Sequence, residues 1–303
     1  MGCQFLCIPN TIGDYLFIVP AVNKIAGTMS DTHFSFDYMN HRIPPMILCL
    51  GLQGSASTWA FNVCAQLVTL AQGSVQCVYA DCLQDLFNSV KAGEEQASTY
   101  VVKSHFADED FSDYLSATGS RYVLTVRDPR DCIVSLMERF GFPFDVALSH
   151  LVCSCHALMR AQSLNGGLLL RYEDQFFQSR RTIPMLRQYL GLGGEVDCAS
   201  LDRLNSQESI MEFINTFDEL PEGRILKINE DSDDALDVVT QWHRHHFGDG
   251  LTGKWRTRLS EKQKVLVTTM LAHPLKHLGY EISENAEVST HSSFAPDREL
   301  VRT

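Results

Sequence analysis

The 303-residue chain has no Cys-x-x-Cys pair, although it contains ten cysteines. Zinc sites and dithiol redox motifs use that spacing, so we interpret the cysteines as free thiols in a reducing compartment. Cys153 and Cys155 form a Cys-x-Cys pair within a stretch predicted to be helical. On a helix these two side chains point to different faces, which disfavours a shared metal ion.

Long apolar runs and excess positive charge are also missing. No stretch reaches the roughly 20 apolar residues of a membrane span, and the N-terminus has no basic start typical of a signal peptide. The net charge of −12 disfavours general binding to nucleic acid or to anionic membranes. We therefore expect a cytoplasmic protein with small or specific partners, and we leave open whether it forms a homodimer.

Short apolar runs alternate with helical patterns through most of the chain. Strands are predicted at 46–51, 75–80, 100–105, 121–126 and 167–172. This alternation is typical of an α/β fold, a parallel sheet flanked by helices and joined by right-handed crossovers. The last third is predicted to be helical: its acidic run 229–237 is interpreted as a solvated helix start, and its closing helix extends from Ser260 to about His277.

Three segments are predicted along the chain. Residues 1–44 show no clean period and are interpreted as an irregular N-terminal extension, to which we assign no role. Residues 45–280 form the α/β domain. Residues 281–303 are polar and aperiodic, which is typical of a disordered tail.

The loop after the first predicted strand, GLQGSASTW at 51–59, contains no lysine or arginine. Its backbone N–H groups and hydroxyls, at the start of a helix, are suited to holding a phosphate group. In an ATPase phosphate loop the second glycine and the lysine would stand where this chain has Ala56 and Ser57. The loop therefore favours an anion other than a magnesium-bound triphosphate.

Other polar side chains follow later strands. Lys103 and His105 lie at the end of the third strand, Arg127 follows the fourth and Tyr172 ends the fifth. Because the carboxyl ends of parallel strands meet at one edge of a sheet, these residues are predicted to face one crevice with the loop.

Together these motifs resemble the sulfotransferases that use 3′-phosphoadenosine-5′-phosphosulfate (PAPS), over about residues 46 to 280. GSASTW at 54–59 resembles their first motif, and Arg127 with Ser135 matches the spacing of their 3′-phosphate pair. KSH at 103–105 is similar to their Lys-Thr-His, and Tyr172-Glu173-Asp174 to their Tyr-Glu-Asp. GLTGKWR at 250–256 and the helix start Ser260 to Gln263 complete the ordered set.

The resemblance implies a three-layer P-loop-like fold and a reaction without a metal. A sulfuryl group would pass from PAPS to a hydroxyl or amine of a small-molecule or carbohydrate acceptor. His105 would be the general base, titrating near pH 7, and Lys103 would stabilise the transferring group. The donor would be bound by Gly54, Ser55, Ala56, Ser57, Thr58, Trp59, Arg127, Ser135, Tyr172 and Gly250. Within this set, Trp59 and Tyr172 would bracket the adenine.

Two departures from the family pattern remove positive charge. Gly54 stands where the family loop has a cation, and Gly248-Asp249 stand where many members have Arg-Lys. Nearby cations that could compensate are Arg244, His245, His246, Lys254 and Arg256.

Two other functions stay open: a sulfotransferase-like domain that binds the bisphosphate without catalysis, and a P-loop nucleotide kinase. The site residues also have structural interpretations. His105 could be a hydrogen-bonding residue, Lys103 a solvated cation and Trp59 part of the core. Arg127 could pair with Asp128, Asp131 or Glu138, Tyr172 could belong to a capping turn, and Ser57 and Thr58 could cap the first helix.

Overall fold

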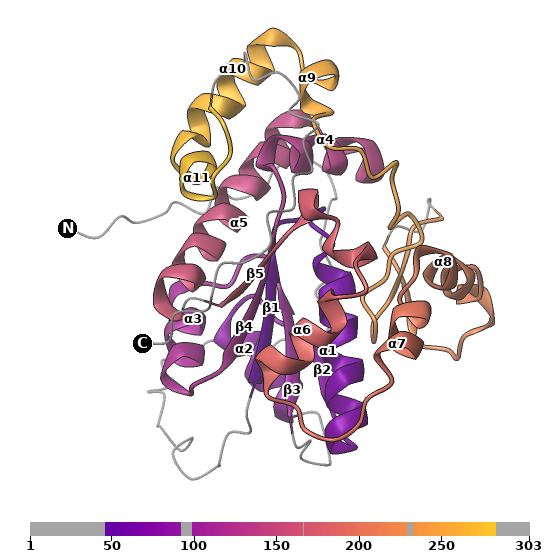
Figure 1. Ribbon diagram of the computed structural model, residues 1–303. Helices are drawn as coiled ribbons and strands as arrows, with labels where there is room; N and C mark the ends of the chain where they lie inside the picture. Colours follow the sequence, from indigo (N-terminus) through magenta and orange to yellow (C-terminus); the bar gives the residue numbers. More distant parts are fainter. Residues whose placement is uncertain (1–45, 92–98, 166, 229–232, 283–303) are drawn as a thin grey trace, which may run out of the picture. The chain divides into compact units, whose positions relative to one another are not determined.

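The computed structural model describes residues 46–91, 99–165, 167–228 and 233–282 (Figure 1). The described residues divide into two compact units. Residues 46–206 and 247–282 form the sheet unit, and residues 207–246 form the small unit. The predicted extension 1–44 and the tail 281–303, apart from its first two residues, lie outside the described residues.

The sheet unit is built on five parallel strands in the order β2-β3-β1-β4-β5. Their bounds are β1 Met46–Gly51, β2 Gln76–Tyr79, β3 Tyr100–Ser104, β4 Arg121–Val126 and β5 Leu168–Arg171. In the central register Cys49 of β1 lies between Lys103 of β3 and Val123 of β4. All five predicted strands are confirmed, with boundaries within two residues.

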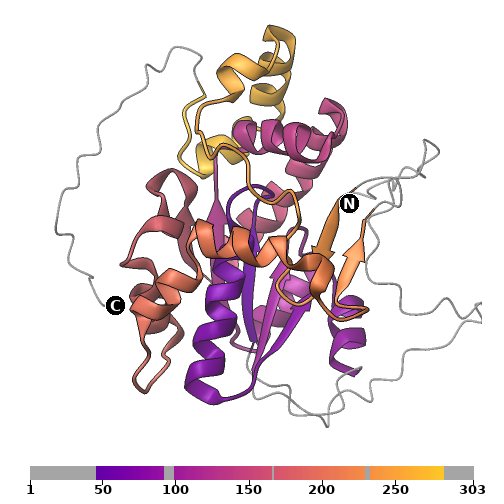
Figure 2. The ribbon, with the colours of Figure 1, turned by 90° about the vertical axis from the view of Figure 1, so that its right-hand side faces the viewer.

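Helices cover both faces of this sheet, which confirms the three-layer architecture (Figures 1 and 2). Helix α1 (Ser57–Gln72) packs on β1, β3 and β4, with α6 (Thr182–Leu190) beside it. Helix α5 (Phe144–Asn165) packs on β1 and β4 from the other face and contacts α3 (Glu109–Ala117) and α4 (Pro129–Phe140). Helix α2 (Leu83–Lys91) contacts β2 and α3. Because α1 and α3 leave β1 and β3 toward opposite faces, a ligand crevice is expected between the ends of these strands.

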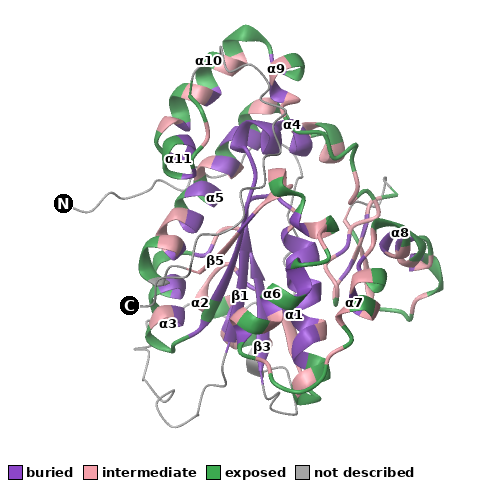
Figure 3. Ribbon diagram, viewed as in Figure 1, coloured by how far each residue is buried: buried purple, intermediate pink, exposed green. Residues whose placement is uncertain are grey.

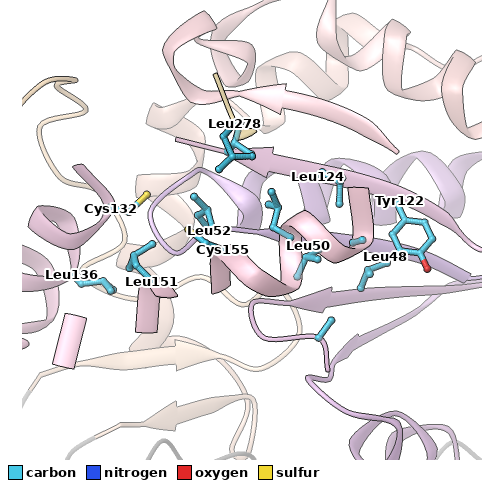
Figure 4. Packing of buried hydrophobic residues seen from close by; sticks show 14 of the residues in the cluster. Leu48, Leu50, Leu52, Tyr122, Leu124, Cys132, Leu136, Leu151, Cys155 and Leu278 are labelled. Carbon is cyan, nitrogen blue, oxygen red and sulfur yellow. The ribbon is translucent and has the colours of Figure 1, made fainter. Parts of the chain in front are cut away.

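The core explains why β1 is apolar throughout. All six of its residues are buried, as Figure 3 shows by colour, because helices cover both faces of the strand. Leu48, Leu50 and Leu52 lie in one cluster with Leu151 and Cys155 of α5 (Figure 4). Fully burying a leucine side chain stabilises the fold by about 1.5–3 kcal/mol, so this cluster fixes the strand that carries the phosphate loop.

Short helices complete the sheet unit. Two 3₁₀ turns, η2 (Tyr172–Asp174) and η3 (Phe176–Gln178), follow β5, and α7 (Cys198–Leu204) follows α6. After α9 (Trp255–Arg258), the predicted closing helix is divided into α10 (Glu261–Met270) and α11 (Ala272–His277). Its start is confirmed by a capping box between Ser260 and Gln263. Its break has a simple cause, because Pro274 has no N–H to donate to the carbonyl of Met270.

The small unit contains two strands that the sequence did not predict. Helix α8 (Gln207–Asn215) and the turn η4 (Phe217–Glu219) are followed by an antiparallel pair, β6 (Ile225–Lys227) and β7 (Ala235–Asp237). The interpretation of 229–237 as a helix start is therefore wrong for Ala235–Asp237, which form a strand; residues 229–232 lie outside the described residues. Asp237 is fully buried and pairs with Arg224, so this acidic side chain is not solvated.

The cysteines behave as the spacing indicated. The eight described cysteines are free thiols. On α5, Cys153 is exposed and Cys155 is buried, which confirms that they point to different faces. Within the described ranges, no helix has the length and apolar character needed to cross a membrane.

Candidate functional site

The phosphate loop ends in an uncapped helix. Helix α1 begins at Ser57, and its first N–H groups have no side-chain cap from the N-cap residue Ala56 or its described neighbours. Ala56, at the N-cap position, has a left-handed backbone with φ of 62°, so Ser57 and Thr58 do not serve as caps. Free N–H groups at a helix N-terminus attract anions, so this loop is suited to holding a phosphate group although it contains no lysine or arginine.

The loop contacts β4 and α4 at one point. A Cβ built on Gly54 would lie 3.1 Å from Ser135 Oγ, and the φ of Gly54 is +85°. Arg127 Nη1 donates a hydrogen bond of 3.1 Å to the carbonyl of Gly54. Gly54, Arg127 and Ser135, all predicted to bind PAPS, therefore lie close together. The backbone of Gly54 has a conformation that only glycine adopts easily.

Arg127 is buried but forms no ion pair with a carboxylate among the described residues. Asp128 pairs with Arg130 instead, at 2.8 Å. Arg127 Nη2 donates to the carbonyl of Leu251 at 2.8 Å, and its guanidinium carbon stacks 4.3 Å from the centre of the Tyr172 ring. Its buried Nε has no hydrogen-bond partner within the described chain. A charged guanidinium held by neutral groups, with one unused donor, is well suited to an anionic ligand.

The segment around Gly250 is anchored by Asp131, a residue that the sequence analysis did not assign to the site. Its carboxylate accepts hydrogen bonds from the backbone N–H groups of Gly253, at 2.6 Å, and Trp255, at 3.0 Å. Burial raises the pKa of Asp131. Asp131 therefore positions the carbonyl of Leu251 against Arg127, and Tyr172 Oη lies 3.5 Å from the carbonyl of Gly250.

Lys103 is buried, so the interpretation as a solvated cation is wrong. Its Nζ donates a hydrogen bond of 2.8 Å to Thr58 Oγ1, which ties β3 to the first turn of α1. Burial lowers the pKa of Lys103 to about 7. The ammonium group of Lys103 therefore loses its proton more readily than that of an exposed lysine in the protein without a ligand.

His105 has the tautomer that a general base needs. Its Nδ1 lies 2.6 Å from the carbonyl of Gly51, and a carbonyl can only accept, so Nδ1 carries the proton and Nε2 has the free lone pair. Burial, together with the charge of Lys103, lowers the pKa of His105 to about 4. The expectation of titration near pH 7 is therefore wrong for the protein without a ligand.

Asp81 organises the turn that presents His105, and the sequence analysis missed it. Its Oδ1 accepts hydrogen bonds from Ser104 Oγ (2.7 Å) and from the N–H groups of His105 and Phe106 (both 3.0 Å). Its Oδ2 accepts from Tyr79 at 2.8 Å. Asp81 lies two residues after the end of β2, so inspecting the residues that follow each strand could have found it.

Two predicted donor contacts have other partners in the structure. Trp59 is 4% exposed, donates to the carbonyl of Asn205 at 2.9 Å and meets Phe176 edge-on, as the core interpretation requires. The buried hydroxyl of Ser55 bonds the carbonyl of Leu52 at 2.6 Å and Thr125 Oγ1 at 2.7 Å. Ser55 thus holds the shape of the loop.

The nearby cations are largely committed elsewhere. Lys254 pairs with Glu138 and with Asp249. Arg256 stacks on Trp255 at 4.6 Å, and within the small unit Arg244 pairs with Asp218 at 2.7 Å. No group of three or more His, Cys, Asp or Glu side chains in the described part of the chain could hold a metal ion.

Part of the chain matches a model of a known protein family. The family model described as the sulfotransferase domain matches residues 12–142. This match covers less than half of the chain, which is therefore similar to that family over this range. The matched range contains the phosphate loop, Lys103, His105, Arg127 and Ser135, and it begins within the segment to which we had assigned no role.

Solved structures support the fold. The chain is similar to a mouse sulfotransferase complexed with PAP, with a TM-score of 0.54 and 12% identity over 77% of this chain and 85% of that one. It is also similar to retinol dehydratase in complex with retinol and PAP, with a TM-score of 0.50 and 14% identity over 77% and 82% of the two chains. The comparison with curated proteins found no match. At these identities the structural likeness shows the sulfotransferase fold.

Proposed function

We propose that this protein binds PAPS and transfers its sulfuryl group to a hydroxyl or amine of a small-molecule or carbohydrate acceptor. One observation carries the proposal: an uncapped helix N-terminus, a buried arginine with no carboxylate partner among the described residues, and a histidine held through Nδ1 lie at one edge of the sheet. The match of residues 12–142 to the sulfotransferase domain model and the PAP complex of the similar mouse sulfotransferase support the same donor, because PAP is the bisphosphate left when PAPS loses its sulfuryl group.

The residues present fit the two charged ends of this donor. Arg127 has an unused Nε donor and lies beside Ser135 across Gly54, which suits the 3′-phosphate. The first turn of α1 and the hydroxyl of Thr58 suit the 5′-phosphate, because free N–H groups and the helix dipole favour negative charge. In this arrangement Trp59 supports the loop from the core.

His105 supplies the base. Its Nε2 takes the proton of the acceptor as the acceptor oxygen or nitrogen bonds to sulfur, and the bond between sulfur and the bridging oxygen breaks. The electron pair leaves on the 5′-phosphate, next to the N–H groups of the loop and Lys103. The negative charge of a bound donor raises the pKa values of both His105 and Lys103, which makes the base stronger and the lysine cationic.

The eight described free thiols support a reducing compartment, and we place the protein in the cytoplasm on that basis.

The experiment is transfer of labelled sulfur from PAPS to a panel of acceptors, for the wild type and His105→Ala. We expect His105→Ala to lower turnover by about 10²- to 10⁴-fold, the usual effect of losing a general base. Binding of adenosine 3′,5′-bisphosphate, measured by calorimetry, should stay nearly unchanged. If His105→Ala unfolds the protein or weakens bisphosphate binding as severely as Arg127→Ala does, His105 is structural and the proposed role is wrong.

A second candidate is a domain that binds the bisphosphate without catalysis. It is favoured by the missing loop cation at Gly54 and by the low pKa of His105, about 4. The same assay separates the two functions, because this candidate predicts bisphosphate binding with no transfer to any acceptor.

A further inference from the structure

The ring of Tyr172 contacts both Arg127 and a second aromatic ring, that of Phe177. Tyr172 lies on the turn η2 and Phe177 on the turn η3, five residues later. The guanidinium carbon of Arg127 lies 4.3 Å from the centre of the Tyr172 ring. The centre of the Phe177 ring lies 4.8 Å from the same point, with the two ring planes inclined by 38°. Both distances fall within the range of favourable cation–ring and ring–ring contacts.

The hydroxyl group of Tyr172 does little to orient its ring. Its Oη lies 3.5 Å from the carbonyl of Gly250, whereas hydrogen bonds between two oxygen atoms are about 2.5–3.0 Å long. Tyr172 is only half-buried, so packing does not enclose its ring on all sides. The orientation of this ring against Arg127 therefore depends mainly on its contact with Phe177.

Phe177 is itself held from the core. Phe176 is buried and meets Phe177 edge-on, with 5.5 Å between the ring centres. Phe176 also meets Trp59 edge-on at 5.7 Å, and Trp59 donates a hydrogen bond to the carbonyl of Asn205. A continuous row of rings thus extends from the first turn of α1 to Arg127, and Phe177 is fixed within this row.

The backbone between the two turns has a conformation that brings the rings together. Gln175 has a left-handed backbone, with φ of 50° and ψ of 40°, which is uncommon for a residue other than glycine. Its N–H donates to the carbonyl of Tyr172 at 2.9 Å, and its own carbonyl accepts from the N–H of Gln178 at 2.9 Å. The chain reverses here, so that Phe177 lies against Tyr172. Strained backbone of this kind persists where the surrounding structure requires it.

We propose that Phe177 is a positioning residue for the 3′-phosphate of the donor and acts through Tyr172 on Arg127. The inference rests on the proposed function and adds a residue to its donor site. The carbonyls of Gly54 and Leu251 hold the two Nη atoms of Arg127, at 3.1 and 2.8 Å, and the Tyr172 ring holds the face of the guanidinium. An arginine that is ordered before the ligand arrives loses less side-chain entropy on binding, so its affinity for the phosphate is higher.

The test compares two ligands that differ only in the 3′-phosphate. Adenosine 3′,5′-bisphosphate and adenosine 5′-monophosphate are titrated by calorimetry against the wild type, Phe177→Leu, Phe177→Tyr, Tyr172→Leu and the double variant with leucine at both positions. The matched control is Phe213→Leu, because Phe213 of the small unit is also half-buried and lies 5.6 Å from the Phe217 ring and 5.7 Å from the guanidinium carbon of Arg224. Thermal unfolding checks that each variant is folded, and Phe177→Met replaces Phe177→Leu if the latter is not.

Phe177→Leu removes the ring and keeps an apolar side chain. It is expected to weaken the bisphosphate by about 3- to 10-fold, which is the contribution of one aromatic pair expressed as an affinity. Binding of the 5′-monophosphate should change by less than about twofold, because this ligand lacks the phosphate that Arg127 holds. Phe177→Tyr keeps the ring and should bind both ligands like the wild type, as should Phe213→Leu. The double variant should bind the bisphosphate like Tyr172→Leu alone, since Phe177 acts through Tyr172.

Equal weakening of both ligands by Phe177→Leu would assign Phe177 a general packing role and overturn the inference. Losses from Phe177→Leu and Tyr172→Leu that simply add, or a loss in Phe177→Tyr as large as in Phe177→Leu, would also overturn it. A wild type that prefers the bisphosphate, with no such loss in Phe177→Leu, overturns this inference alone and leaves the proposed donor site standing. A wild type that binds the two ligands equally, or binds neither, shows that Arg127 holds no 3′-phosphate; the proposed function then fails, and the inference fails with it.

Discussion

Replacing Lys103 by methionine should make the protein more stable at neutral pH and inactive as a transferase. The ammonium group of Lys103 is buried beside Thr58, and burial lowers its pKa from 10.5 to about 7. A lysine with a lowered folded-state pKa binds its proton more weakly in the folded chain than in the unfolded chain. Stability therefore rises with pH between about 7 and 10.5 and is reduced by the full cost of the buried charge below that window.

The pKa values give the size of the effect. The fall in the pKa of Lys103 from 10.5 to about 7 corresponds to roughly 5 kcal/mol of stability, nearly all of it lost at pH 6 and about 2 kcal/mol of it lost at pH 9. Lys103→Met removes this cost together with the hydrogen bond to Thr58, which is worth about 1–3 kcal/mol. We expect the variant to be more stable than the wild type by about 2–4 kcal/mol at pH 6, and this gain should be roughly 3 kcal/mol smaller at pH 9.

Urea unfolding of the ligand-free protein at pH 6, 7, 8 and 9 measures both quantities. Lys262→Met is the matched control, because Lys262 is an exposed lysine on α10 and its replacement should change stability little at any pH. The reasoning is refuted if Lys103→Met is less stable than the wild type across the whole range. A stability difference that does not depend on pH would equally refute it.

Three further predictions concern the same edge of the sheet. Gly54→Lys should not restore a family-like loop but destabilise the protein by about 1–3 kcal/mol, because a side chain at φ of +85° is strained and meets Ser135; unchanged urea unfolding would contradict this. Asp81→Ala should lower the free energy of unfolding by at least about 2 kcal/mol and reduce turnover, since Asp81 accepts four hydrogen bonds around His105. A variant with normal stability and activity would show that the turn does not depend on Asp81. For His105, whose pKa falls from 6.5 to about 4, the stability contribution is complete above pH 6.5 and is lost as the pH falls toward 4. Removing the ring with His105→Ala should flatten the stability profile in that window, and an unchanged profile would refute the assignment.

The fold could be read from the sequence because its decisive signals are local. A continuous apolar run such as 46–51 between turn residues identifies a buried parallel strand, and alternation with helices then fixes the architecture. The rule on strand ends also predicted that Lys103, His105 and Arg127 would gather at one edge. The structure shows these three residues around the loop, as that rule requires.

The burial and the pKa values of those residues could not be predicted from the sequence in the same way. Whether Lys103 is buried, and how far the pKa of His105 falls, depends on neighbours such as Thr58 and Gly51 that are distant in sequence. Trp59 is held by Asn205, and Asp131 by the N–H groups of Gly253 and Trp255, so only tertiary packing reveals their roles. The strand β7 was missed because its acidic composition favours a helix start, whereas the buried Asp237 has a specific partner in Arg224.

The central claim, that this fold holds a 3′-phosphorylated nucleotide at Arg127, is tested most directly by thermal unfolding with adenosine 3′,5′-bisphosphate. At a hundred times its dissociation constant the ligand should add about 2.7 kcal/mol and raise the melting temperature by several degrees. ATP with magnesium should give no shift, and Arg127→Ala should abolish the shift with the bisphosphate. An unchanged melting temperature at millimolar bisphosphate, or an equal shift with magnesium ATP, would contradict the account.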